Sequence, residues 1–138
     1  MTAGFNKFNC FALNLGKKTE NLSAADVFKV YLTDVAPVAT NTVFNTPAEI
    51  AAGNGYVAGG NGCAITSWAL TGGTAKWVLV SPAVWTAGPA AMAQFRYAVL
   101  YDSTTTNLIG WWDYTAEINM LLNDTFTVTF GADVIELA

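Results

Sequence analysis

The chain has 138 residues, of which 12% are charged and 53% hydrophobic, with 6 basic residues, 10 acidic residues and no histidine. This length is sufficient for one domain with its own core, and the net charge of −4 argues against nucleic-acid binding through the phosphate backbone. The absence of histidine excludes the usual Ser-His-Asp and Cys-His catalytic groups. The low charge predicts that part of the surface is buried against another protein, and a compact, neutral monomer covered by threonine is the alternative.

The first predicted element is a short amphipathic helix. Phe5, Phe8 and Phe11 recur at helical spacing. This pattern predicts a helix over residues 5–15 that ends near Gly16. The same region lacks the uninterrupted apolar run of a signal peptide, and no apolar stretch is long enough to span a bilayer. We therefore expect a protein that is made in the cytoplasm and has no membrane partner.

The remaining elements are predicted to be strands, because apolar and polar residues alternate in short runs between turn residues. These runs are residues 27–33, 64–70, 75–80, 94–101, 108–114, 125–130 and 134–137. The clearest is the run 125–130, in which Phe126, Val128 and Phe130 alternate with threonines. Two glycines at 72 and 73 predict a tight hairpin turn between residues 64–70 and 75–80.

The order of these elements predicts the fold class. Strands do not alternate with helices, so a parallel α/β sheet is not expected. We predict an all-β single domain, a β-sandwich or jelly roll of about seven to eight short strands with a short N-terminal helix. An open barrel is the alternative architecture.

Residues 41–60 form a run rich in glycine and asparagine around one tyrosine. Because both residue types adopt positive φ angles readily, this run is predicted to be an ordered loop of defined shape. Asn54 and Tyr56 lie within it. Tyr56 has two interpretations: it anchors the protein in a partner's pocket, or its ring folds back over the loop's own sheet.

Trp111, Trp112, Asp113 and Tyr114, followed by Glu117, form the most enzyme-like pattern. Paired carboxylates beside aromatic rings are typical of glycoside hydrolases. However, the spacing does not place two carboxylates on facing strands, so hydrolysis is not expected. In the structural interpretation one tryptophan lies in the core, the other lies at the surface, and the aspartate caps a turn. Sugar contact is the alternative.

A calcium site is a further hypothesis. Asp102, Asp113, Asp124 and Asp133 all lie near strand ends, where loops can gather oxygen ligands. They show no Asp-x-Asp-x-Asp spacing, and turn capping explains their positions better.

The two cysteines, Cys10 and Cys63, belong to no metal-binding motif. We expect them to be buried free thiols, with one disulfide between them as the alternative. No metal or cofactor is therefore expected.

Several blocks of the sequence together resemble a family of small virion structural proteins of tailed bacteriophages. The blocks are residues 36–43, 48–60, 95–101, 108–114 and 125–130. The resemblance implies a virion component of the head and carries over no catalytic residues.

The role implied by this resemblance is that of a capsid decoration or cement protein on the outer surface of the head. Its partner would be the major capsid protein, and the decoration protein would itself be a homodimer or homotrimer. The N-terminal segment 1–16 and the glycine-rich loop would make the contacts. The residues chosen for this role are Phe5, Phe8, Phe11, Asn54 and Tyr56.

The alternative role is a tail, tail-tip or head-fibre module that touches the host surface. In that role Trp111, Trp112 and Tyr114 would form a stacking platform for sugar beside Asp113.

Overall fold

The computed structural model describes residues 4–23, 26–131 and 134–137 of the chain. Within these residues it contains one helix and ten strands, and every strand pairing is antiparallel. The predicted all-β domain with a short N-terminal helix is confirmed. In chain order the elements are β1 (Phe5–Lys7), α1 (Asn9–Gly16), β2 (Phe28–Thr33), β3 (Asn61–Cys63), β4 (Ile65–Thr71), β5 (Thr74–Leu79), β6 (Trp85–Thr86), β7 (Phe95–Asp102), β8 (Leu108–Ile118), β9 (Thr125–Phe126) and β10 (Ile135–Leu137).

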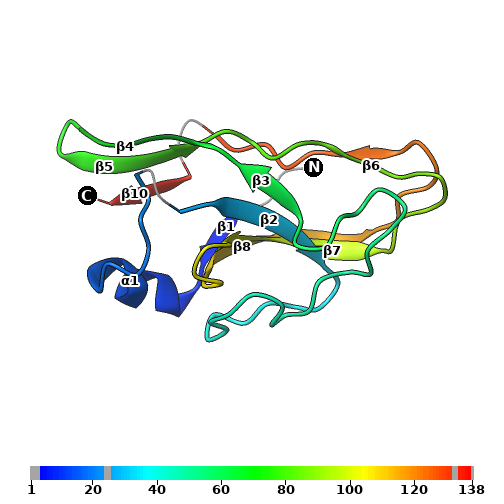
Figure 1. Ribbon diagram of the computed structural model, residues 1–138, viewed down its shortest axis with the longest axis horizontal. Helices are drawn as coiled ribbons and strands as arrows, with labels where there is room; N and C mark the ends of the chain where they lie inside the picture. The colour runs from blue at the N-terminus through cyan, green and yellow to red at the C-terminus, as the bar shows by residue number, and fades with distance from the viewer. Residues whose placement is uncertain (1–3, 24–25, 132–133, 138) are drawn as a thin grey trace.

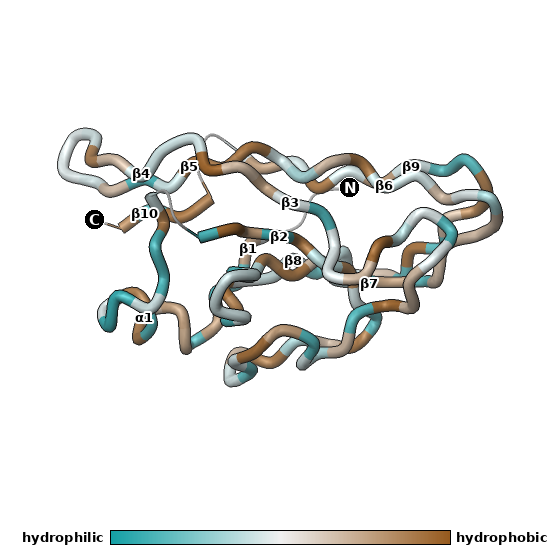
Figure 2. The backbone as a smooth tube through the Cα atoms, viewed as in Figure 1, coloured by the Kyte–Doolittle hydropathy of each residue, from teal (hydrophilic) through white to brown (hydrophobic). Residues whose placement is uncertain are grey.

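The strands form a sandwich-like arrangement of layers. A five-stranded sheet has the order β1-β8-β7-β2-β3, a three-stranded sheet the order β10-β5-β4, and β6 pairs with β9. Figure 1 shows the two smaller sheets along one face of the five-stranded sheet, with α1 and the segment between β2 and β3 on the opposite face. Figure 2 shows hydrophobic residues in every layer and few long hydrophilic stretches, as the low charge content requires.

The five-stranded sheet is covered on both faces, so its central strands are buried on both sides. On one face Phe28 packs edge-on against Trp77, with ring centroids 4.8 Å apart. On the other face Tyr31 packs edge-on against Phe44 at 5.2 Å. In β2 the alternation of residues predicts one buried and one exposed face, but Tyr31 and Thr33 are as fully buried as Phe28 because both faces are covered.

The N-terminal residues differ from the predicted helix over residues 5–15. Residues Phe5–Lys7 form β1, which pairs with β8 at the edge of the large sheet, and the helix begins only at Asn9. Phe8 connects the two elements, and its backbone N–H donates to the carbonyl of Ile109 at 3.0 Å. The edge of β8 offers unpaired backbone groups, and these hydrogen bonds outweigh the weak helical pattern.

The β4–β5 hairpin is confirmed as predicted. Gly72 and Gly73 form its two-residue turn with φ angles of 58° and 84°. Such a turn requires positive φ at both central positions, which glycine adopts without steric cost.

The predicted strand over residues 125–130 is only partly formed. Its first two residues make β9, whose partner β6 is also only two residues long. Val128 is still buried and the three threonines are exposed, so the predicted inward and outward faces are correct. The hydrogen-bonded ladder ends because its partner strand ends.

Candidate functional site

The glycine-rich loop is held against the large sheet by tyrosine hydroxyls. Tyr56 is 2% exposed, and its hydroxyl donates to Glu49 Oε2 at 2.6 Å. The same oxygen accepts the backbone N–H of Gly59 at 2.8 Å, and the Tyr101 hydroxyl donates to the carbonyl of Gly59 at 2.8 Å. Burial and the bond to Glu49 raise the pKa of Tyr56 far above its ordinary value, so the phenol keeps the proton that it donates.

Of the two interpretations of Tyr56, the structure supports the one in which the ring folds back over its own sheet. Its glycine neighbours are required by the same close packing. Gly60 has a φ of 78°, and a Cβ at this position would collide with the carbonyl of Val30. Gly55 has a φ of 98°, and a Cβ there would collide with the carbonyl of Thr86. The predicted ordered loop is therefore present, and its geometry serves the fold.

The other residues predicted to contact a partner are mostly part of the protein's own core. Phe8 and Phe11 are 0% and 1% exposed, and Phe5 packs against Trp112 with ring centroids 5.1 Å apart. Only Asn54 of the predicted set is exposed. This placement corrects the predicted contact role of Phe8, Phe11 and Tyr56, because a side chain without free surface offers nothing for a partner to bind.

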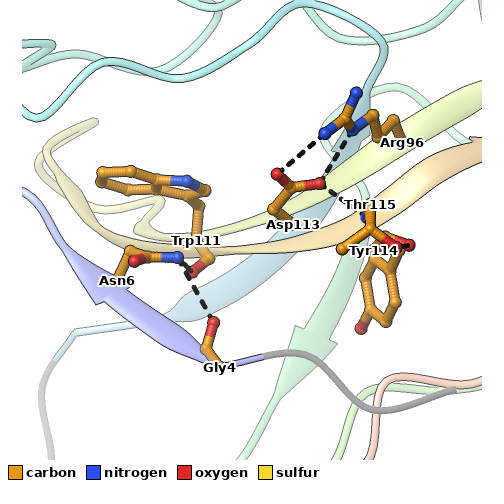
Figure 3. Close-up of polar contacts among 7 residues, drawn as sticks. All are labelled: Gly4, Asn6, Arg96, Trp111, Asp113, Tyr114 and Thr115. Carbon is orange, nitrogen blue, oxygen red and sulfur yellow. Dashed lines mark hydrogen bonds and ion pairs between the residues drawn. The ribbon is translucent and has the colours of Figure 1, made fainter.

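The aromatic residues of β8 do not form one platform, because successive side chains of a strand point to opposite faces. Figure 3 shows Trp111 and Asp113 on one side of β8 and Tyr114 on the other. Trp112 also points into the core, where it stacks on Phe130 with centroids 5.5 Å apart. The predicted sugar platform of three rings beside an aspartate is therefore divided between two faces. The prediction that one tryptophan is buried and the other more exposed is correct.

Asp113 is held in an ion pair rather than placed for acid or base catalysis. Its two carboxylate oxygens accept from Arg96 Nε at 2.8 Å and Nη2 at 3.1 Å, as Figure 3 shows. The backbone N–H of Thr115 also donates to Asp113 Oδ1, but both residues lie inside β8, so the prediction that Asp113 caps a turn is wrong. The bond to Arg96 lowers the pKa of Asp113, whereas a glycosidase acid requires a raised pKa.

Of the four aspartates considered for calcium, the three that the structure describes do not come together. Asp113 pairs with Arg96, and Asp124 accepts the backbone N–H of Leu121 at 2.9 Å. Asp133 lies outside the described residues. Asp102 instead joins two acidic residues that the sequence reasoning missed.

These three carboxylates, Glu20, Asp26 and Asp102, are the candidate functional site and are called the acidic cluster below. One oxygen from each lies within 4.8 Å of the oxygens of the other two. Glu20 and Asp102 are buried at 5% and 0% exposure, and Asp26 is half-buried. These three residues belong to no local motif, so the only sequence feature that pointed to the site was Asp102 at the end of a predicted strand.

The register of the large sheet explains how the acidic cluster forms. Asp102 is the last residue of β7 and pairs with Phe28, the first residue of β2, which places Asp26 beside it. The turn between β7 and β8 then binds the segment before β2, because Ser103 N–H donates to the carbonyl of Val27 at 2.7 Å.

Glu20 is brought to the cluster by the β7–β8 turn. Its Oε1 accepts the side-chain amide of Asn107 at 2.7 Å and the hydroxyl of Thr105 at 3.2 Å. Glu20 and Asp26 are therefore the neighbours of Asp102. The β7–β8 turn, which orients Glu20, also holds Asp102 in position.

Asp102 has an unusual electrostatic environment. Its Oδ1 accepts the backbone N–H groups of Thr104 at 2.8 Å and Thr105 at 3.3 Å. Its Oδ2 is buried and has no hydrogen-bond partner among the described residues. Burial, followed by the neighbouring carboxyls of Glu20 and Asp26, raises the pKa of Asp102 to about 9. The site is thus rich in oxygen atoms, and the basic residue Lys18 lines a cleft together with Glu20.

Neither ion pair found among the described residues, Lys76–Glu136 and Arg96–Asp113, involves the acidic cluster. Glu20 also lines a cleft of about 380 Å³ beside the end of α1, and Leu15, Leu22 and Trp68 supply its apolar walls. The cluster is therefore close to a concave part of the surface.

The cysteines are free thiols, as expected, and form no disulfide. Burial raises the pKa of both, that of Cys63 to about 12, so both are poor nucleophiles. Across the described parts of the chain, none of the helical structure has the length and apolar character needed to cross a membrane.

Comparison of the chain with protein-family models, with curated proteins and with solved structures gives no match in any of the three.

Proposed function

We propose that the chain is a non-enzymatic structural protein of a bacteriophage virion, and that it decorates the outside of the assembled head shell. The resemblance of its sequence blocks to small phage virion proteins supports this assignment. The single structural observation that carries it is an apolar row on the β4–β5–β10 sheet that no described part of the chain covers.

This apolar row consists of Leu70, Ala75 and Leu137, which lie opposite one another on three adjacent strands. Cross-strand partners share a face of a sheet, so these side chains point the same way. Leu70 is 72% exposed and Leu137 is 42% exposed. Figure 1 shows that the β4–β5 hairpin extends past the end of the large sheet, which leaves this row without a layer to pack against.

The neighbouring residues on the same face of this sheet are covered by the rest of the protein, unlike the apolar row. One step further from the turn, Trp77 and Ile135 face the same side and are 0% and 7% exposed. The hydrophobic face is therefore continuous from the core to the projecting end. Burying such surface against a partner is favourable, and β4 is an edge strand that offers its backbone to a partner strand as well.

Decoration requires binding to the assembled shell in many copies. A protein that binds only the assembled lattice stabilises it by mass action, and oligomers of the decoration protein add avidity. We propose the major capsid protein as the partner and a homo-oligomer as the binding form.

The first test is the copy number of this protein in purified particles, measured by quantitative mass spectrometry against the major capsid protein. A number comparable with that of the capsid subunits is expected. A few copies per particle would overturn decoration and indicate a tail or vertex location. Absence from the particle would overturn the virion assignment.

The second test uses the apolar row. Leu70→Asp is expected to weaken binding to empty shells at least about tenfold, because a charge would have to be buried at the contact. Leu121→Asp is the matched control, since Leu121 is 66% exposed and lies in the segment between β8 and β9 at the other end of the molecule. Equal binding by the two variants, with unchanged circular dichroism, would remove the row from the interface.

A further inference from the structure

We propose that Glu20, Asp26 and Asp102 bind one divalent cation, and that calcium is the ion that fits this acidic cluster best. The inference rests on the geometry of the three carboxylates and is independent of the proposed role in a virion.

The spacing of the carboxylate oxygens matches a calcium ion. Calcium binds oxygen at about 2.3–2.6 Å, so two ligands on opposite sides of the ion lie up to about 5 Å apart. The three oxygens of the acidic cluster lie within 4.8 Å of one another. Magnesium binds at about 2.0–2.1 Å and requires ligands within about 4.2 Å. Calcium therefore fits at any separation up to this limit of 4.8 Å, whereas magnesium fits only where opposite oxygens lie within about 4.2 Å.

The second observation is the free oxygen of Asp102. This side chain is 0% exposed, and its Oδ2 receives no N–H or hydroxyl donor among the described residues, because the groups beside this carboxyl are the carboxyls of Glu20 and Asp26. A buried carboxylate oxygen without a partner is costly. Each neighbour in the cluster is another carboxyl group, which repels a charged Asp102. A cation between the three groups removes both costs at once.

The hydrogen bonds around the cluster orient the carboxylates as the outer partners of metal ligands do. Asn107 and Thr105 hold Glu20, and the backbone N–H of Asn21 donates to Asp26 Oδ2 at 2.8 Å. All three proposed ligands are hard oxygen donors, which suit calcium, magnesium or manganese better than zinc. Solvent from the cleft beside Glu20 can complete the coordination.

A bound ion would join two parts of the chain that are distant in sequence. Glu20 and Asp26 belong to the connection between α1 and β2, whereas Asp102 belongs to the end of β7. This connection also forms a wall of the cleft. Calcium would therefore stabilise the fold and fix the shape of that wall.

The test is isothermal titration of chelator-treated full-length protein with calcium chloride, together with thermal unfolding in calcium and in EDTA. One calcium per chain and a higher unfolding midpoint in calcium are expected. Asp102→Asn and Glu20→Gln are expected to lower the affinity at least about tenfold, since even the outer partners of metal ligands have effects of about that size. Asp124→Asn is the matched control, because Asp124 caps a different turn, and it should bind calcium as the wild type does.

Circular dichroism will show whether the variants fold. If Asp102→Asn does not, Asp26→Asn at the half-buried position replaces it. Absence of both heat and a shift in midpoint at millimolar calcium would overturn the site and leave a cluster that shares a proton. Unchanged affinity in the folded Asp102 or Asp26 variant would also overturn it. Tighter binding of magnesium than of calcium would overturn the choice of ion.

Discussion

The glycine-rich loop and the acidic cluster both place a carboxyl group against the large sheet, but they differ in the hydrogen-bond donors that they give to this group. In the loop, Glu49 receives a hydroxyl from Tyr56 and a backbone N–H from Gly59 on the same oxygen. In the cluster, Asp102 leaves Oδ2 unpartnered among the described residues, and its neighbours are two more carboxyl groups. In the loop, the protein's own groups supply the hydrogen bonds to Glu49, whereas in the cluster the oxygen of Asp102 is still available to a ligand.

The two regions therefore have different roles in the molecule. The loop has the more conspicuous sequence, yet its tyrosine, its glutamate and two of its glycines, Gly55 and Gly60, serve internal packing. The acidic cluster is inconspicuous in the sequence but holds a buried carboxyl oxygen that receives no N–H or hydroxyl donor among the described residues. A surface carboxylate such as Asp113, paired with Arg96, is a third case, in which solvent and a partner share the charge. Four variants test this difference between the loop, the cluster and the ion pair.

The largest effect is expected for Gly60→Ala, which would break the loop. The positive φ and the collision of a Cβ with the carbonyl of Val30 should lower the free energy of unfolding by at least about 3 kcal/mol. Gly72→Ala is the control, because Gly72 also has a positive φ but no atom within 4 Å of its Cβ position. It should cost about 1–2 kcal/mol. Urea denaturation measures both, and equal losses would show that the contact at Gly60 contributes little.

Tyr56→Phe tests whether the loop is satisfied internally. Loss of the hydroxyl removes a hydrogen bond to a carboxylate, so the free energy of unfolding should fall by about 1.5–3 kcal/mol. Tyr114→Phe is the control, since Tyr114 is similarly buried and contributes packing against Phe126. It should change stability little by the same measurement. If the two variants are equally stable, the bond to Glu49 is not what holds the loop.

Asp102→Asn is expected to raise the free energy of unfolding when a chelator is present, whereas the two loop variants lower it. An amide of the same shape still accepts from Thr104, but it removes the carboxyl group that burial and its neighbours disfavour. Stability in EDTA should rise by about 1–3 kcal/mol, the usual cost of a poorly satisfied buried polar group. Thermal unfolding in EDTA measures the change, and a loss of stability there would show that Asp102 is as well satisfied as Glu49.

The smallest effect is expected for the ion pair of Asp113. Because Arg96 lowers its pKa in the folded state, the pair stabilises the protein above the unfolded pKa of about 3.9. This contribution is lost as the pH falls through the lower, folded pKa. Asp113→Asn should therefore be slightly less stable than the wild type near pH 7, and the difference should shrink below the unfolded pKa and vanish once the pH is below the folded pKa. A difference that stays constant across this range would assign the effect to packing.

Much of the fold was predictable because it depends on local patterns. Gly72 and Gly73 form a tight turn that pairs the two strands on either side of it, whatever the rest of the fold. The alternation of residues also places Val128 inside and its threonine neighbours outside, as the structure has them. The same alternation, applied to β8, separates Trp111 from Trp112 and argues against the predicted sugar platform. That error was avoidable from the sequence.

The N-terminus and the candidate site were not predictable in this way. Residues Phe5–Lys7 became a strand because the edge of β8 was free to pair with them. Their helical spacing predicted only the later part, Asn9–Gly16. The acidic cluster depends on the register between β2 and β7, which no local pattern encodes.

The fold class, the position of the hairpin and the absence of a histidine-based catalytic group can be read from the sequence, because each depends on residue type or on neighbours a few positions apart. The folded structure is needed to learn which aromatic side chains are buried, which apolar row lies beyond the core, and which carboxylates meet. Those properties arise when distant segments pair and layers cover one another. The unsatisfied oxygen of Asp102 exists only because Glu20 and Asp26 are brought to it by folding.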